Sequence, residues 1–488
     1  MVERLTRRQA LVAAGAAAGA AALGGRTAAG LGATDPVRGL RRVVRGPVYR
    51  VPNSANLVYD LRYAGVRPLA VAQPVSSADV AAAVKFCVGR GIPVTPRSGG
   101  HSYAGYSTQA GGVVLDLRRL NGVRLSGGMA TIGPGAQLID VYRKLNAHGV
   151  TVPAGSCPSV CIGGHATGGG MGLAGRKLGL TLDRVVGLRA VTPDGRVRNV
   201  DASGAGSDLF WALRGGGGRN FAIVTAFEMR PAPIPRTGSW FSISYPYSQA
   251  SAAIAAWQAW APHTSTNVTS IVSLTPGRIS IFGQSFGSES SLRALLGPLR
   301  RVSGAVVTTG TASYFGLMRR WAGCAQLSVP ACHTRGTAPG GTLSKARYAA
   351  KSRFFSRPLS SAGRQAFLHA IARAPSGSSL LIDSWGGAIN AVDSTDTAFV
   401  HRDAIFSVQE LTYFGSGSNG SHTAWLASTD AALAPYSNGE AYQNYIDPTL
   451  RGWRGAYYGS NYARLASIQA KYDPDLAFHF RQSIGSAG

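Results

Sequence analysis

The sequence feature that most constrains the fold is a glycine-rich segment that begins at Gly155. Residues 155–172 read GSCPSVCIGGHATGGGMG, with seven glycines in eighteen positions. A backbone with so few side chains can pass very close to a flat or anionic partner. The segment does not fit the glycine patterns of Walker or Rossmann phosphate loops. We therefore expect a ligand site built by a different loop architecture.

A second glycine motif follows an expected strand at 92–97. Residues 96–107 read PRSGGHSYAGYS. Adjacent glycines after a strand expose successive backbone N–H groups, and such groups suit a diphosphate. Such turns are common, so this motif alone does not specify a function.

Two further stretches complete the pattern. Residues 208–225 read DLFWALRGGGGRNFAIVT, and residues 442–447 read YQNYID. The four stretches, in this order and spacing, resemble the berberine-bridge-enzyme-like branch of the vanillyl-alcohol-oxidase flavoproteins. The resemblance extends over about residues 55–484.

The resemblance implies an α+β fold with a two-part, PCMH-type FAD-binding domain. A substrate domain with an antiparallel β-sheet covered by helices is expected beside it. We expect a leader at 1–34, the FAD domain at 55–235, the substrate domain at 236–434, and a C-terminal segment, 435–488, that returns to the FAD domain. A chain of 488 residues with 45% hydrophobic residues can bury the core that this requires.

The resemblance also implies that FAD is bonded covalently at two places. The histidine of the RSGGHS motif, His101, would be bonded to the flavin 8α-methyl group, and Cys157 of GSCPSV to flavin C6. Imidazole and thiolate are the nucleophiles that such bonds need. A second thiol, Cys161, stands where the family commonly has glycine, although the spacing and the following proline favour Cys157. The other residues expected at the cofactor are Arg97, Ser98, Gly99, Gly100, Ser102, Gly163, Gly164, Gly168, Gly169, Gly170, Gly172, Ile223 and Tyr445.

The catalytic residues expected from the resemblance are Tyr445, Tyr442, Asp383 and Gln409. Tyr445, the second tyrosine of YQNY, is the expected general base; its phenol needs a nearby cation or hydrogen-bond donor to ionise near neutrality. Tyr442 and Tyr103 are expected to line the pocket. Asp383 and Gln409 lie in expected strands at 383–389 and 399–409. Because side chains alternate along a strand, the sequence does not show on which face of the sheet these two lie.

Val160 bears on the electron acceptor. In relatives, valine at this position goes with access of oxygen to the flavin, which favours an oxidase that makes hydrogen peroxide. The leading substrate hypothesis is an alcohol of a carbohydrate or glycoside. The alternative is a tailoring oxidase of a secondary metabolite that oxidises an alcohol or an amine or closes a ring. No metal is expected, and the oligomeric state stays open.

The charge balance raises a third possibility, a basic protein that binds nucleic acid or anionic surfaces. The formal net charge is +27. The arginines are scattered singly, without a dense basic run, so solvated surface charge is the favoured interpretation. The expected partners are a small organic substrate and O2, without nucleic acid.

The N-terminus indicates export. Residues 6–12 read TRRQALV and are followed by a run of small apolar residues, as in twin-arginine signals. A membrane anchor is disfavoured because the run is short and rich in Ala and Gly, so no stable membrane span is expected after the signal is removed. An extracellular or cell-envelope location is expected, with a cytoplasmic one as the alternative. Outside the cytoplasm, Cys324 and Cys332 could close a small disulfide loop, and Cys87 is expected to be a buried helix residue.

Periodicity and turn residues predict the regular elements. A helix is expected to start near Ser76, and others at 137–147 and 461–471. The remaining strands are expected at 68–72, 113–117, 185–191, 196–200, 240–245 and 270–274.

Overall fold

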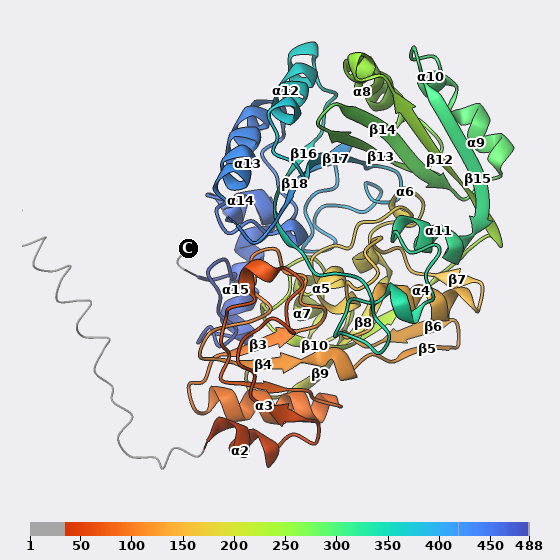
Figure 1. Cartoon of the computed structure of the whole chain (residues 1–488). Coiled ribbons are helices and arrows are strands. Elements are labelled where there is room, and N and C mark those ends of the chain that lie inside the picture. Colours follow the sequence, from red (N-terminus) through yellow and green to blue (C-terminus); the bar gives the residue numbers. More distant parts are fainter. Residues whose placement is uncertain (1–34, 418, 487–488) are drawn as a thin grey trace, which may run out of the picture.

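The computed structural model describes residues 35–417 and 419–486. These residues form two small sheets at one end of the molecule and one large sheet at the other (Figure 1). The twin-arginine sequence that predicts export lies outside the described residues. Within the described ranges, no helix is both long and apolar enough to cross a membrane.

The first small sheet has the strand order β1-β2-β4-β3, with parallel pairing of β2 and β3 to β4. Its strands are β1 (Val48–Tyr49), β2 (Ala70–Ala72), β3 (Val94–Arg97) and β4 (Val113–Asp116). Helix α3 (Ser77–Val88) packs on it and begins, as predicted, after Ser76, whose side chain accepts a hydrogen bond from the Asp79 N–H. Cys87 is buried in this helix, also as predicted.

The second small sheet is antiparallel, with the order β5-β6-β10-β8-β9. Its strands are β5 (Val123–Ser126), β6 (Met129–Ile132), β8 (Val185–Val191), β9 (Val197–Asp201) and β10 (Ile223–Met229); a separate pair joins β7 (Val150–Thr151) to β11 (Ala232–Pro233). The short helices of this half are α2 (Pro36–Arg41), α4 (Leu138–Asn146), α5 (Ile162–Thr167), α6 (Gly175–Leu178) and α7 (Ser207–Ala212).

The large sheet is antiparallel, with the order β15-β12-β14-β13-β17-β18-β16. Its strands are β12 (Thr237–Tyr245), β13 (Val268–Thr275), β14 (Arg278–Ser285), β15 (Val306–Ser313), β16 (Arg347–Phe355), β17 (Ser378–Ser384) and β18 (Phe406–Phe414). Helices lie on its outer face (Figure 1). They are α8 (Ala250–Trp260), α9 (Glu289–Leu295), α10 (Gly297–Arg300), α12 (Ser361–Ala372) and α13 (Gly420–Leu433), while α11 (Tyr314–Trp321) lies towards the small sheets. The expected α+β fold with a helix-covered antiparallel sheet is confirmed.

The alternation of each strand separates the two faces of this sheet. In β17, Leu380 and Ile382 join the core beneath the covering helices. The residue that follows each of them, Leu381 and Asp383, points to the other face of the sheet. That face is turned towards the two small sheets.

The C-terminal segment packs against the second small sheet. It contains α14 (Trp453–Tyr458) and α15 (Tyr462–Tyr472). Tyr457, Leu465 and Ile484 share a buried core with Phe210 and Phe221. The C-terminal segment thus shares one core with the second small sheet, and the large sheet is inserted between them in sequence.

Two strands have bounds that differ from those predicted. The expected strand at 383–389 ends at Ser384, and the one at 399–409 begins only at Phe406. The reason is local: Gly386 and Gly387 have φ of 90° and 59°, which ends the extended backbone. A side chain at Gly387 would also collide with the carbonyl oxygen of Arg176.

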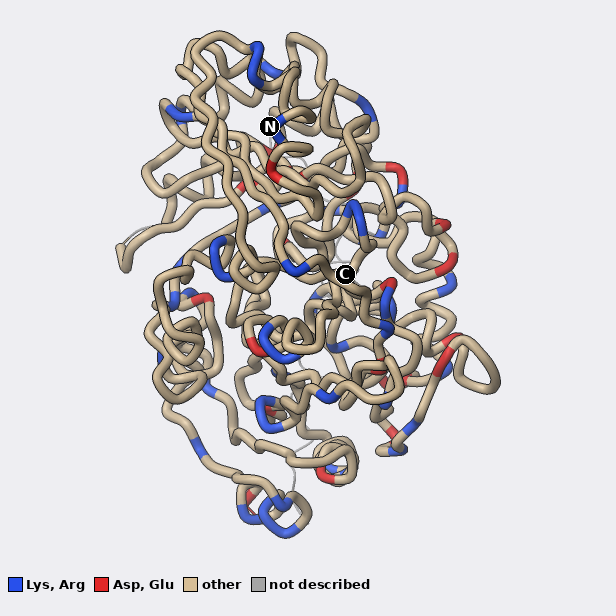
Figure 2. Tube along the Cα trace, turned by 90° about the vertical axis from the view of Figure 1, so that its right-hand side faces the viewer, with Lys and Arg blue, Asp and Glu red and all other residues tan. Residues whose placement is uncertain are grey.

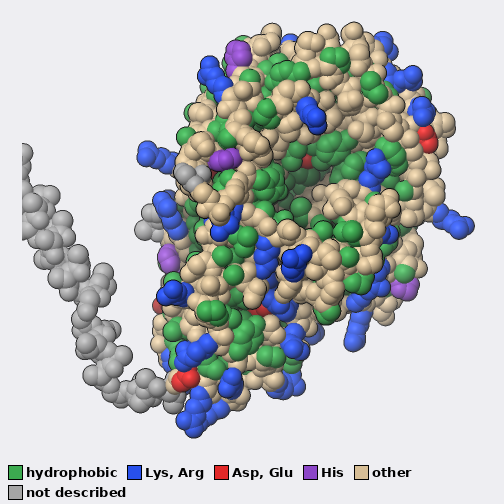
Figure 3. Space-filling model, viewed as in Figure 1, with side chains coloured by type: hydrophobic (Ala, Val, Ile, Leu, Met, Phe, Trp, Pro, Cys, Tyr) green, Lys and Arg blue, Asp and Glu red, His purple; other side chains and the backbone are tan. Residues whose placement is uncertain are grey.

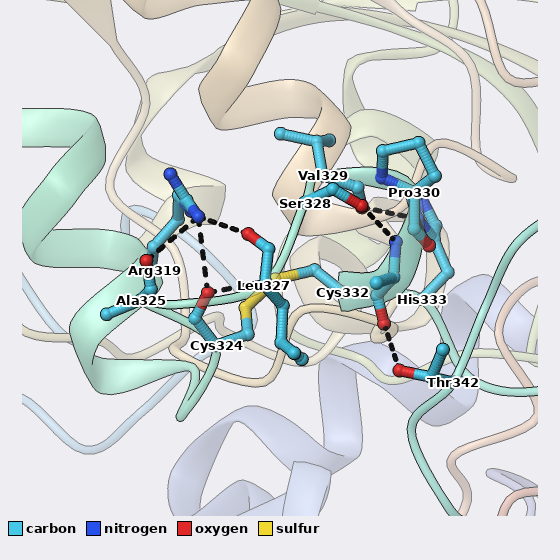
Figure 4. The surroundings of a disulfide bond; sticks show 11 residues. Arg319, Cys324, Ala325, Leu327, Ser328, Val329, Pro330, Cys332, His333 and Thr342 are labelled. Carbon is cyan, nitrogen blue, oxygen red and sulfur yellow. Dashed lines mark hydrogen bonds between the residues drawn. A yellow bond between two sulfur atoms is a disulfide. The ribbon is translucent and has the colours of Figure 1, made fainter.

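The predicted disulfide between Cys324 and Cys332 is present, with the two Cα atoms 5.9 Å apart. It closes a short loop around which the side chain of Arg319 donates hydrogen bonds to backbone carbonyls (Figure 4). The next residue, His333, contacts Asp140 of α4 through Nε2 at 2.9 Å. The disulfide loop is thereby attached to the half of the molecule that carries the small sheets.

The basic residues do not gather on one element. Figure 2 shows Lys and Arg dispersed along the described trace, with acidic residues between many of them. This distribution agrees with the interpretation of the positive charge as solvated surface charge.

Arg176 ties the glycine-rich half to the large sheet. Its guanidinium is fully buried and has only backbone carbonyls as partners. Nη1 donates to the Val268 carbonyl at 2.8 Å, and Nε donates to the Trp385 carbonyl at 3.1 Å. Further carbonyls at Pro262, Thr264 and Ser265 complete the set. Burial lowers the pKa of Arg176 to about 10, which keeps it charged at neutral pH.

We expect Arg176→Met to lower the free energy of unfolding by at least about 3 kcal/mol, because several buried carbonyls lose their donor at once. Thermal and urea unfolding of the FAD-loaded protein measure the loss. Arg293→Met is the control: Arg293 makes an exposed pair with Glu289, worth less than about 1 kcal/mol. Equal effects of the two substitutions would contradict this role of Arg176.

Candidate active site

A cavity of about 430 Å³ lies between the large sheet and the glycine-rich loops. Figure 3 shows a hollow near the centre of the molecule, surrounded mainly by hydrophobic side chains. The residues around the cavity come from the two glycine motifs, from the loop before β10, from strands β13, β17 and β18, and from residues 442–446. Segments far apart in sequence therefore meet at one place.

Most of the residues singled out in the sequence line this cavity. They are Ser98, Gly99, Gly100, His101, Ser102, Tyr103, Cys157, Val160, Gly163, Gly164, Gly172, Ile223, Asp383, Gln409, Tyr442 and Tyr445. The structure therefore brings the expected cofactor and catalytic residues together.

Four expected cofactor residues do not line the cavity. Arg97 is buried behind it and pairs with Asp116 at 2.6 Å, so its guanidinium is already engaged. A side chain at Gly168 would strike Asn444, one at Gly169 would strike Tyr442, and one at Gly170 would strike Thr181. Close packing therefore requires glycine at these three positions.

His101 is held with one ring nitrogen occupied. Its Nε2 lies 3.1 Å from Ser159 Oγ, and Tyr59 stacks on the ring with centroids 4.3 Å apart. Burial lowers the pKa of His101 to about 3, so the ring is neutral. Among the described residues, Nδ1 has no hydrogen-bond partner, which leaves that nitrogen available as a nucleophile.

The two thiols near His101 differ in access. Cys157 is exposed to the cavity, although its burial within the protein raises the pKa of the thiol. Cys161 is buried, its Sγ donates to the Gly135 carbonyl at 3.3 Å, and burial raises its pKa to about 12. Of the two, Cys157 is the thiol that a bound molecule could reach more easily.

The register of the large sheet settles which way Asp383 and Gln409 face. Ile271 of β13 lies opposite Asp383, and Leu381 lies opposite Gln409. Because directly opposed residues share a face, all four side chains point into the cavity. Gln409 Nε2 donates a hydrogen bond to the Tyr103 hydroxyl at 2.9 Å.

Tyr445 stands in an aromatic stack above the glycine-rich loops. Tyr103 lies parallel to it, with centroids 5.3 Å apart and planes at 13°. Burial, followed by the charge of Asp383, raises the pKa of the Tyr445 phenol well above 10. The two main influences on this phenol, burial and the charge of Asp383, both disfavour the phenolate.

Asp383, unlike Tyr445, has a pKa close to neutrality. Burial raises the pKa of its carboxyl to about 7. A group with this pKa can accept or release a proton near neutrality, where the phenols around it cannot.

Tyr442 lines the cavity as expected, but its hydroxyl is used by the backbone. It accepts hydrogen bonds from the N–H groups of Gly170 at 2.8 Å and Met171 at 3.2 Å. The Asn444 side-chain amide donates to the same oxygen at 3.0 Å. These bonds hold the glycine-rich turn in place.

Several residues at the cavity were not singled out in the sequence. Arg219 has φ of 67°, rare for a residue with a side chain, and it donates to the Gln109 amide oxygen. Arg219 Nε and Ser107 Oγ are buried without hydrogen-bond partners and border the cavity. The run of four glycines before Arg219 was the available signal. The wall residues Ile271, Leu381, Leu411 and Tyr413 carry no motif, and only the strand register reveals them.

The cavity fits a flavin dinucleotide. Its wall has a glycine-edged section at Gly99, Gly100, Gly163 and Gly164, unpaired polar atoms at Ser107 and Arg219, and two nucleophiles at His101 and Cys157. Backbone N–H groups and a guanidinium suit a diphosphate, and a neutral imidazole with a cavity-facing thiol suits attachment of the flavin ring. Fold and site together define a flavin-dependent oxidoreductase.

Comparison with known proteins gives the family. A family profile described as "FAD binding domain" matches residues 68–201, and one described as "Berberine and berberine like" matches 441–485. A chitooligosaccharide oxidase of Gibberella zeae is 32% identical, over 87% of this chain and 89% of its own length. The chain therefore belongs to the berberine-bridge-enzyme-like family of FAD-linked oxidoreductases.

Solved structures agree with this assignment. The Physcomitrella patens protein BBE-like 1 matches with a TM-score of 0.85 at 28% identity, over 92% of this chain and 99% of its own. A glucooligosaccharide oxidase from Acremonium strictum matches with a TM-score of 0.84 at 26% identity, over 92% and 99% of the two chains. The latter is described with a 6-S-cysteinyl, 8α-N1-histidyl FAD.

We expect Tyr442→Phe to lower the free energy of unfolding by about 1–3 kcal/mol, because two buried N–H groups lose their acceptor. Chemical unfolding at neutral pH measures the change. Tyr445→Phe is the matched control, since the Tyr445 hydroxyl has no hydrogen bond among the described residues. An equal loss in both variants would show that the Tyr442 hydroxyl does not hold the turn.

Proposed function

We propose that this protein oxidises an alcohol with FAD bonded at both His101 and Cys157 and passes the electrons to O2. The substrate would lose a hydride from carbon and a proton from the hydroxyl; O2 would take up two electrons and two protons to give hydrogen peroxide. FAD, when bound, supplies the acceptor for the hydride equivalent. The boundaries 55–235, 236–434 and 435–488 and the export of the chain are part of the same proposal.

The observation that carries the proposal is that one cavity holds both nucleophiles and the acid–base groups. His101 and Cys157 lie in its loop wall, while Asp383 lies in its sheet wall. The free Nδ1 of His101 supports attachment there, since Ser159 occupies the other nitrogen. In the Acremonium protein the histidyl bond is described at N1.

The proton path follows from the pKa values. Because its pKa lies well above 10, Tyr445 is a neutral phenol at neutral pH, so it would take up the proton of the substrate hydroxyl only as its own phenolic proton leaves towards Asp383. Asp383, with a pKa of about 7, would take up the proton from the tyrosine side. Tyr103, held by Gln409, fixes the ring plane of Tyr445 by stacking.

Val160 supports O2 as the acceptor. It lines the cavity three residues after Cys157, and its side chain is smaller than that of leucine. The family tendency that links valine here with oxygen access points the same way.

Two substrate classes remain open at this level. An alcohol of a carbohydrate or glycoside is supported by the relatives named as oligosaccharide oxidases. The alternative is an alcohol of a secondary metabolite, with the protein acting as a tailoring oxidase.

We expect both the His101→Ala and the Cys157→Ala protein to keep one flavin bond and the double variant to lose FAD on denaturation. The reason is that each residue alone suffices to hold the cofactor covalently. Mass spectrometry of the denatured proteins and of their peptides measures the attachment.

Cys161→Ala is the matched control and should retain both bonds, because its thiol is buried and engaged with Gly135. Flavin mass on the denatured double variant, or loss of the cysteinyl bond in Cys161→Ala, would overturn the assignment.

We expect kcat/KM to fall as the pH drops through about 7, because Asp383 must be deprotonated to take up the proton. Above that pH the wild-type value should level off. In Asp383→Asn this dependence should vanish and the plateau should drop by about 100-fold or more. Initial rates of peroxide formation between pH 5 and about pH 9 check this. A slope near pH 7 that survives in the variant would assign it to another group.

A further inference from the structure

We propose that the substrate is an apolar, planar alcohol with one reacting hydroxyl rather than an oligosaccharide. This inference rests on the proposed alcohol oxidation and names the substrate class of that same site. It is drawn from the side chains of the sheet wall, which no motif specifies.

The sheet wall has three aliphatic side chains beside the polar groups of Thr269, Asp383 and Gln409. Ile271, Leu381 and Leu411 come from the adjacent strands β13, β17 and β18. Ile271 lies directly opposite Asp383, and Leu381 lies directly opposite Gln409. Asp383 and Gln409 are therefore each bordered by a branched aliphatic side chain on the same face.

Apart from Thr269, few hydrogen-bonding groups are left for a substrate on this wall. Asp383 is the only carboxylate among the described lining residues, and Arg219 the only arginine or lysine. Arg219 is committed elsewhere, next to Tyr106, Gln109 and Phe480. The Gln409 amide already donates to Tyr103.

This wall suits one kind of molecule better than the other. A sugar ring carries hydroxyls on most of its carbons, and those pressed against Ile271, Leu381 and Leu411 would lose water without gaining a partner. An apolar ring would instead bury its surface favourably and leave one hydroxyl at Asp383 and Tyr445.

The entrance of the cavity adds a flat apolar surface. Tyr413, next after Leu411 on the same face of β18, is 45% exposed and lines the cavity. Its ring lies against Tyr348, with centroids 5.7 Å apart. An exposed tyrosine held by a second ring can stack on a planar substrate. Figure 3 shows the same hydrophobic surround at the hollow.

The test measures reduction of the flavin in the holoenzyme without oxygen, by loss of its visible absorbance. The probes are cinnamyl alcohol and 4-methoxybenzyl alcohol on one side, and cellobiose and N,N′-diacetylchitobiose on the other. We expect the second-order rate constant of flavin reduction for the better aromatic alcohol to exceed that for either sugar by at least about 100-fold.

Two variants test whether the wall is the cause. Leu381→Gln and Leu411→Gln should each lower kcat/KM for the aromatic alcohol about tenfold, with covalent flavin content unchanged. Val306→Gln is the matched control: it makes the same kind of change on β15 at an exposed residue outside the cavity lining, and it should change kcat/KM less than about twofold.

The outcomes separate the two levels of the proposal. Faster reduction by sugars would overturn the substrate class and leave the alcohol oxidation intact. Wall variants that behave like Val306→Gln would also overturn it. Flavin that is covalently bound but reduced by neither class would refute the alcohol oxidation and the substrate class with it.

Discussion

The buried guanidinium of Arg176 is the contact on which the geometry of the cavity most depends. It extends from the glycine-rich half into the start of β13 and the end of β17, and it binds both through backbone carbonyls. The guanidinium has five N–H donors and no carboxylate as a partner. It can therefore donate hydrogen bonds to backbone carbonyls of several chain segments at once. Because Asp383 lies two residues before Trp385, this contact also fixes the distance between the Asp383 carboxyl and the glycine-rich loops.

A second buried contact secures the connection between β17 and β18. Arg402 forms a two-pronged pair with Asp183, at 3.0 and 2.7 Å, and so joins that connection to the loop before β8. Both contacts join the large sheet to the glycine-rich half. The cavity between them is therefore a preformed space with a fixed distance between its loop wall and its sheet wall, as binding of a rigid ring system requires.

The sequence predicted the loop wall better than the sheet wall, for a physical reason. His101, Cys157 and the glycines around them are constrained by local backbone conformation, so their spacing is visible as a motif. Ile271 and Leu381 depend on the register of strands far apart in the chain, and any apolar residue there fits a strand equally well. Asp383 and Gln409 were identified only through family resemblance, and register was needed to show their facing.

Other features that the sequence did not predict have the same origin. The hydroxyl of Tyr442 accepts a hydrogen bond from the turn at Gly170, a contact that the local sequence does not reveal. The strand expected at 383–389 stops early because Gly387 must pass close to the Arg176 carbonyl. In both cases a contact between distant segments sets what the local sequence does not show.

The two-faced construction of the large sheet has a consequence for how such a protein can change over generations. Leu380 and Ile382 hold the helices, while Leu381 between them lies outside that core, lines the cavity and packs beside Leu411 on the opposite face. Substitutions at alternate positions of one strand can therefore remodel molecular recognition at little thermodynamic cost, whereas their immediate neighbours are not free to vary. A fold with this division can diversify its chemistry while its architecture stays the same.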